Sequence, residues 1–267
     1  MSANETLLTP SRVRGWRLGL ANMLGKEMSG WWRTRRWWIQ CLLALALLNV
    51  TLALNIDSGQ PITSTGLNFL IVAGFAAPIA AVSLGQDSIL GERHSGTAAW
   101  VLSKPLRRPA FILAKLIAHA LGFLATWLVL PGTLAYFQIT ANGLPQLSQS
   151  GWVGAVGLIY LNVFFYLTLA LMLATLFNGR GPVLGITLLI LFSGPIGLID
   201  PSIQDYAPWL MEVLPWRLVM PIGVELPLAG YLAMGASLPT VIPIVATALW
   251  CVLFAGVAIW RMRREEF

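Results

Sequence analysis

The sequence predicts an all-α membrane protein with six transmembrane helices, and three observations support that fold class. The chain has 267 residues, of which 57% are hydrophobic and only 10% are charged, whereas a soluble domain carries about 25% charged residues. Several apolar segments reach the roughly 20 residues that cross a hydrocarbon layer about 30 Å thick. Most cations lie in the short segments between them. We therefore expect a single transmembrane domain covering residues 1–267.

The six spans are predicted from the apolar segments, in chain order. Gly194-Pro195 interrupts the fifth, because proline disfavours a continuous helix. Both cysteines fall within spans, where buried thiols usually serve packing. The predicted spans are 37–55, 67–84, 109–137, 152–177, 183–199 and 240–260.

The first 36 residues form a short basic segment that leads into the first span. Its later part mixes charged side chains with a tryptophan cluster, and tryptophan prefers the membrane–water interface. We expect residues 16–34 to form an elbow helix lying along the inner leaflet; an ordinary cationic flank with a tryptophan anchor is the alternative. The candidate residues of this elbow and of its junction with the first span are Lys26, Glu27, Arg33, Arg35 and Arg36.

The distribution of cations predicts the orientation. An even number of spans puts both termini on one side, and placing them inside brings every Lys and Arg except Arg217 to the cytoplasm. Connecting loops are short, so the positive-inside rule applies. Topology thus explains the basic isoelectric point of about 9.8, and a nucleic-acid partner, which would need the cations on one folded surface, is not expected.

The segment 85–108, between the second and third spans, is a charged, polar stretch between two long apolar runs. Gly96-Thr97 interrupts the helix, with Thr97 a plausible N-cap. Apolar residues then follow at helical spacing until Pro105 disfavours helix. We predict a short coupling helix beneath the membrane.

Residues 200–239 form an apolar loop on the outer side, with prolines at 201, 208, 215, 221 and 227. Each proline limits helix length, so only short helical turns fit. The composition leaves two readings open, a re-entrant cap packed on neighbouring spans or an interfacial loop.

The chain carries no Walker A, HExxH or GxSxG motif. The segments outside the membrane are far shorter than the 100–200 residues or so of a typical domain, so we expect no ATPase within this chain and no metal site. Lys115 lies near the inner surface, where it can snorkel, and His119 lies one turn deeper on the same face. Although packing is the commoner role, His119 is our candidate for contact with a substrate or proton path.

The stretch GERHSGTAAWVLSKPLRRPAFILAKL resembles the signature of ABC-2 type transporter permeases, with His94 where the family usually has Glu. The resemblance implies a multi-pass permease in a prokaryotic cell membrane. It would work as a dimer in an ATP-driven exporter and bind no cofactor itself, with ATP and Mg²⁺ held by separate ATPase subunits. The residues it implies for coupling are Asp87, Glu92, Arg93, Gly96 and Thr97, then Ser103, Lys104, Pro105 and Arg107.

Two other classes of function remain open from the sequence. One is a membrane-embedded lipid-modifying enzyme that uses His94 or His119, although no acid, base or metal ligand lies at helical spacing from either. The other is a scaffold that holds a cytoplasmic ATPase at the membrane without transporting anything.

Overall fold

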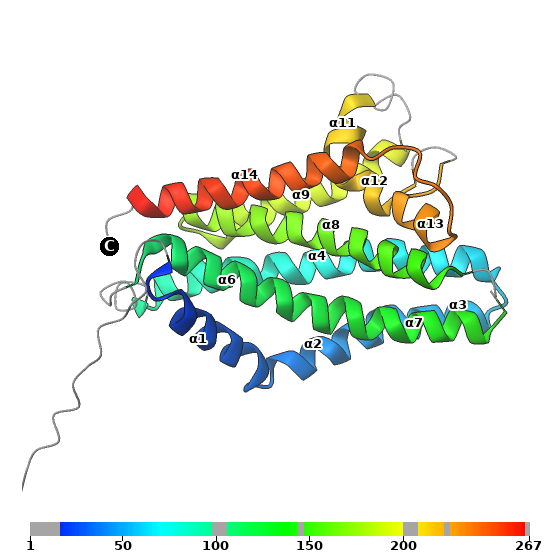
Figure 1. Cartoon of the computed structure of the whole chain (residues 1–267), viewed down its shortest axis with the longest axis horizontal. Helices are drawn as coiled ribbons and strands as arrows, with labels where there is room; N and C mark the ends of the chain where they lie inside the picture. Colours follow the sequence, from blue (N-terminus) through cyan, green and yellow to red (C-terminus); the bar gives the residue numbers. More distant parts are fainter. Residues whose placement is uncertain (1–16, 98–105, 144–146, 200–207, 222–224, 265–267) are drawn as a thin grey trace, which may run out of the picture.

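The computed structural model describes residues 17–97, 106–143, 147–199, 208–221 and 225–264, and no β-strand occurs among them. The long helices run side by side. The end of α14 (Ile242–Arg264) and the start of α1 (Leu20–Trp32) lie at the same end of the bundle (Figure 1). The other long segments are α2 (Arg36–Ala44), the π-helix η2 (Leu45–Asn49), α3 (Val50–Asp57), α4 (Ile62–His94), α6 (Arg108–Phe123), the π-helix η3 (Leu124–Val129), α7 (Leu130–Ala141), α8 (Gln149–Leu176) and α9 (Arg180–Ile199).

Five helices in the described ranges are long and apolar enough to cross a membrane. They correspond to predicted spans one to four and six. The predicted fifth span is α9, whose apolar stretch Arg180–Gly194 is shorter and measures about 22 Å at 1.5 Å per residue. The five are Arg36–Asp57, Thr63–His94, Arg108–Ala141, Gln149–Leu176 and Ile242–Arg264.

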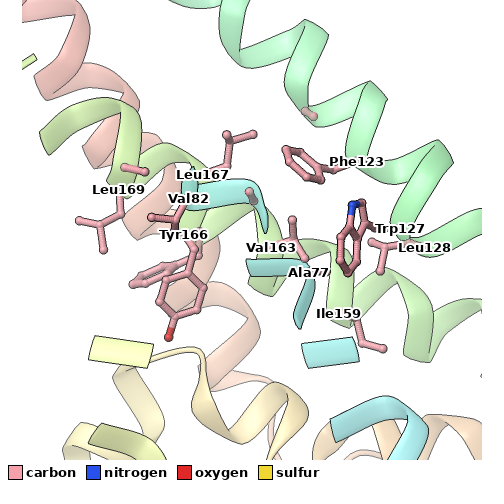
Figure 2. Packing of buried hydrophobic residues seen from close by; sticks show 14 of the residues in the cluster. Ala77, Val82, Phe123, Trp127, Leu128, Ile159, Val163, Tyr166, Leu167 and Leu169 are labelled. Carbon is pink, nitrogen blue, oxygen red and sulfur yellow. The ribbon is translucent and has the colours of Figure 1, made fainter. Parts of the chain in front are cut away.

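The hydrophobic core lies where α4, α8 and the segment α6–η3 meet. Figure 2 shows Phe123 and Trp127 facing this centre, close to Ala77 of α4 and Val163 of α8. In Arg108–Ala141 and in α8, two thirds of the most apolar stretch is buried inside the molecule. The buried share is only 28% for Arg36–Asp57 and 22% for α14. The first and last spans therefore form the exposed apolar faces of the molecule.

A helix lies within the range predicted for the elbow but is shorter, at Leu20–Trp32; its position along the inner leaflet remains a prediction. It packs against α6 and meets α2 at a sharp turn (Figure 1). Within this turn the Thr34 hydroxyl donates to Gly30 O at 2.7 Å and accepts from Arg36 N at 3.2 Å. One side chain thus connects the end of α1 with the start of α2.

The second span continues as a helix ten residues past its predicted end at 84, so residues 85–94 are helical where we expected a loop. The polar residues of this part gain partners from other helices, described below, which removes the reason to end the helix at the membrane surface. The helix ends at His94, and Gly96 follows with φ +72°, a left-handed conformation that glycine adopts without strain.

In its described part, the outer loop contains three short helices, as its prolines predict: α11 (Pro208–Val213), α12 (Trp216–Val219) and α13 (Leu228–Ala233). They are not solvated turns. α12 and α13 pack on α4 and α8, and the Trp216 ring lies so close to Gly194 that a Cβ there would be 2.7 Å from it. The cap-like packing of this loop agrees with the first of the two readings, while its depth in the membrane remains a prediction.

Spans one and three are joined by polar side chains at membrane depth. Trp127 Nε1 donates to Gln40 Oε1 at 2.8 Å. Asn49 Nδ2 donates to Pro131 O at 3.0 Å and to Gln138 Oε1 at 3.1 Å. The π-helices η2 and η3 lie in these same two spans, so the pair deviates from regular helix where it is cross-linked.

Candidate functional site

The candidate site is the basic end of the bundle, which we define as the end where α1 and α6 begin and α4, α8 and α14 end. Figure 1 shows it at the left. The described loop 95–97 and the start of α6 both lie here. The described positions predicted to couple to an ATPase therefore lie at the same end as the start of the amino-terminal helix.

Four charged residues form an ion-pair cluster at this end: Lys26 and Glu27 of α1, Glu92 of α4 and Lys115 of α6. Lys115 Nζ lies 3.0 Å from Glu27 Oε1 and 3.1 Å from Glu92 Oε1. Lys26 Nζ lies 2.7 Å from Glu92 Oε1. Two positive and two negative charges balance, so the cluster ties three helices together without a net buried charge.

The prediction that Lys115 snorkels to the surface is wrong. Its side chain is 1% exposed and its ammonium group is held by the two carboxylates. A buried ammonium group is unstable unless it is paired, and Glu27 and Glu92 provide the pairing. The elbow residues Lys26 and Glu27 thus contact the helix that leads into the loop as well as the helix that leaves it.

Arg93 and His94 connect the end of α4 to the end of α8. The Arg93 guanidinium donates to Ala174 O at 2.8 Å and to Thr175 O at 3.3 Å, which are carbonyls of the last turn of α8. His94 Nε2 lies 3.0 Å from Asn178 O. Cations satisfy the free carbonyls and the negative dipole at a helix C-terminus, so the contact fixes the end of α4 against α8.

Three more contacts extend this network to neighbouring segments. Asp87 Oδ1 accepts from the Arg180 guanidinium at 2.5 Å, which links α4 to the first residue of α9. Arg108 donates to Arg263 O at 2.9 Å, in the last turn of α14. The Arg107 backbone amide donates to Leu18 O at 3.1 Å, just before α1. Both ends of the predicted coupling segment are thus anchored to neighbouring helices.

The loop itself is described only at its beginning. Gly96 N donates to Arg93 O at 3.1 Å, and the Thr97 hydroxyl donates to Glu92 O at 3.3 Å. The Thr97 side chain therefore binds the end of α4. The predicted coupling helix and the predicted site residues Ser103, Lys104 and Pro105 lie outside the described residues.

The remaining elbow residues, Arg33, Arg35 and Arg36, behave differently from Lys26 and Glu27. All three side chains are exposed. They form no ion pair with another described residue, and three exposed tryptophans surround them: Trp32, Trp37 and Trp38.

His119 belongs to α6, and its side chain contacts α1. Its Nδ1 donates to Lys115 O at 2.8 Å, and its ring meets the Trp31 ring edge-on at 5.8 Å between centroids. Its Nε2 is buried and has no hydrogen-bond partner in the described part of the chain. These contacts are those of a packed side chain; its predicted contact with a transport path remains a prediction.

The described residues contain no group of three or more His, Cys, Asp or Glu side chains placed to hold a metal ion. The two histidines that an enzyme could use are each bound to a backbone carbonyl, Asn178 O for His94 and Lys115 O for His119. Nothing in this arrangement presents a nucleophile or an acid–base pair to a substrate.

Sequence reasoning missed Arg108, Arg180 and the coupling of Lys115 to Glu27. A signal existed for the last: apart from Glu5 near the start of the chain, Glu27, Asp87 and Glu92 are the only acids predicted on the inner side before the tail, and a lysine one turn inside a span needs such a partner. Arg108 and Arg180 had no comparable signal, because their partners are a backbone carbonyl and a carboxylate brought near by the fold.

These helices define a multi-pass membrane protein whose charged end joins several helices through ion pairs and hydrogen bonds. The chain belongs to the ABC-2 family of transporter proteins, whose sequence model matches residues 21–267. It is therefore a membrane transport protein, an ABC-2 type permease, rather than an enzyme.

Two curated relatives support the family assignment over nearly the full chain. The Probable ABC transporter permease protein NosY of Stutzerimonas stutzeri is 28% identical, and the alignment covers 89% of this chain and 93% of the relative. The protein of the same name from Pseudomonas aeruginosa is 27% identical, with 88% of this chain and 92% of the relative covered.

Proposed function

We propose that the chain is the membrane subunit of an ABC-type exporter and is driven by separate ATPase subunits that bind at the basic end. ATP and Mg²⁺ would be held by those subunits. Two copies, or this chain and a similar one, would form the transport path, with α9 as the fifth of six spans. The family assignment and the names of the two relatives support the transport role.

The proposed orientation places the basic end and both termini in the cytoplasm of a prokaryotic cell. At the basic end lie most of the described cations, whereas Arg217 at the opposite end is bound by Glu212 and by Glu225, the latter at 2.6 Å. The positive-inside rule favours this arrangement.

The observation that carries the coupling proposal is the ion-pair cluster together with the Arg93 contact. A partner that displaces residues 95–107 would move α4 and α6, because both helices lead directly into that segment. Glu92 and Lys115 connect the same displacement to α1, and Arg93 connects it to α8. Because this short segment is connected to four helices, its displacement would move all four together.

The Arg93→Gln variant tests this role. It removes a charge-assisted contact worth roughly 1.5–3 kcal/mol, so we expect about a tenfold loss or more in the ATP hydrolysis of the purified complex that depends on this chain. The amount of co-purified ATPase should stay unchanged. Arg264→Gln is the control, since Arg264 stacks on Trp260 of its own helix at 4.3 Å.

Normal ATP hydrolysis in the Arg93→Gln complex would contradict the proposal that motion of residues 95–107 reaches α8 through Arg93. Complete loss of the ATPase from the complex would instead assign Arg93 to binding. The same proposal also predicts that glycine or proline introduced within 98–102 abolishes transport while the ATPase remains attached. A scaffold without transport activity would hold an ATPase whose turnover is unaffected by either change.

A further inference from the structure

A groove of about 680 Å³ lies between the first span and α4, with Trp127 at its base. Its volume is typical of ligand sites. From Val72 to Leu84 its wall rises about 18 Å along α4 at 1.5 Å per residue, slightly more than half of a hydrocarbon layer about 30 Å thick. The groove thus has the length of one leaflet. Its apolar walls include Leu43, Leu47, Phe75, Ala76 and Ile79.

The wall of the groove formed by the first span leads along that helix toward the cationic elbow. Arg36 lies one turn before Gln40, and Gln40, Leu43 and Leu47 line the groove at helical spacing on the same face. Arg33 and Arg35 lie in the adjoining turn between α1 and α2. All three arginines are exposed and have no acidic partner among the described residues. Arginine binds phosphate oxygens in a bidentate manner.

We propose that the groove and the three arginines together bind one anionic phospholipid of the leaflet at the basic end. An acyl chain would lie between the first span and α4, and the phosphate would bind Arg33, Arg35 and Arg36. The exposed tryptophans Trp32, Trp37 and Trp38 lie at the level of the headgroup, where indole rings are favoured.

Charge distinguishes a lipid from a second copy of the chain as the occupant. A symmetric contact through this groove would place the same patch of both copies face to face, bringing six unpaired arginines together. The acid that follows Ser83 on the same face of α4 is Asp87, and its carboxylate is bound by Arg180 at 2.5 Å. The surroundings are therefore suited to an anion.

Native mass spectrometry of the delipidated full-length chain, titrated with phosphatidylglycerol or phosphatidylcholine, tests the proposal. We expect phosphatidylglycerol to bind at least tenfold more tightly. The variant with Arg33→Gln, Arg35→Gln and Arg36→Gln should lose that preference, since each basic residue near an anionic surface contributes about a fivefold effect. Ala76→Leu with Ala80→Leu fills the groove and should weaken binding of both lipids.

The matched control replaces three cations at the end of α14, namely Arg261→Gln, Arg263→Gln and Arg264→Gln. It removes the same charge at the same end and should keep the preference for phosphatidylglycerol. Equal loss in both triple variants, or no preference in the unaltered chain, would overturn the proposal. Lipid binding in detergent requires no ATPase, so this result is independent of the proposed transport function.

Two measurements keep the proposal testable if a variant fails to fold. A photoreactive phosphatidylglycerol should label residues 36–47 and 72–84 of the unaltered chain; labelling confined to the exposed face of α14 would contradict it. Cross-linking between Leu43→Cys chains in membranes, above the background from native Cys41, would show that a second copy covers the groove and would also overturn it.

Discussion

Lys115 carries its charge at a position where its side chain is 1% exposed, so its carboxylate partners determine whether the surrounding helices assemble. The Lys115→Met variant leaves Glu27 and Glu92 with Lys26 as their only partner in the cluster. Breaking a buried ion pair in this way costs about 3–5 kcal/mol. We expect a large fall in the midpoint temperature of unfolding of the purified chain.

Lys26→Met is the control for Lys115, because the Lys26 side chain is 51% exposed and exposed pairs contribute about 0–1 kcal/mol. Adding Glu27→Gln and Glu92→Gln to Lys115→Met removes the uncompensated charges and should recover part of the loss. Equal midpoints for Lys115→Met and Lys26→Met would show that the cluster does not stabilise the fold.

The polar contacts between spans one and three can be tested by replacing Asn49. Asn49→Leu removes two hydrogen bonds from its amide, to Pro131 O and Gln138 Oε1. Hydrogen bonds between membrane helices contribute about 0.6–2 kcal/mol, so we expect a loss of roughly that size in the free energy of unfolding. Thr51→Val is the matched control, because the Thr51 hydroxyl donates only to carbonyls of its own span. An equal effect of the two changes would contradict the role of Asn49.

At the scale of elements, the docking of α1 depends on one glycine of α6. A Cβ at Gly122 would lie 2.5 Å from the Trp31 ring, which is fully buried. Gly122→Val should therefore displace α1 and expose it to limited proteolysis within residues 20–32. Gly157→Val in α8 meets nothing within 4 Å and should leave α1 protected. Protection of α1 in the Gly122→Val variant would refute this packing.

The sequence predicted the existence and order of the long helices well, because about 20 apolar residues with few charges require a membrane helix. It predicted their ends poorly. The continuation of α4 to His94 depends on Arg180, Lys26 and Lys115, which approach Asp87 and Glu92 only after folding. No local pattern carries that information.

The local sequence pattern did not predict the π-helices η2 and η3 either. Each interrupts an apolar run that reads as a regular helix, and they lie in the two spans joined by the Gln40–Trp127 and Asn49–Gln138 contacts. Such bulges are frequent at functional sites. η2 includes Asn49 and η3 includes Trp127, so each bulge contains a residue that contacts the other span.

At the scale of the molecule, the basic end joins the ends of most of the long helices through charged side chains, whereas toward the opposite end short helices of an apolar loop pack on α4, α8 and α14 (Figure 1). This asymmetry agrees with a protein that receives mechanical work at one end. The candidate site was predicted from the charged segment 85–108, but the sequence did not reveal that α1, α8 and α14 would anchor it.

The most direct test of the account places a photo-cross-linking amino acid at Thr97, at the basic end, and in a second variant at Ser58, at the opposite end of the bundle. Both side chains are exposed. Irradiation of native membranes should link Thr97, and not Ser58, to a protein with a Walker A motif, and ATP should change the yield. Capture of such a protein from Ser58 alone, or from neither position, would contradict the proposal that a separate ATPase drives this permease from its basic end.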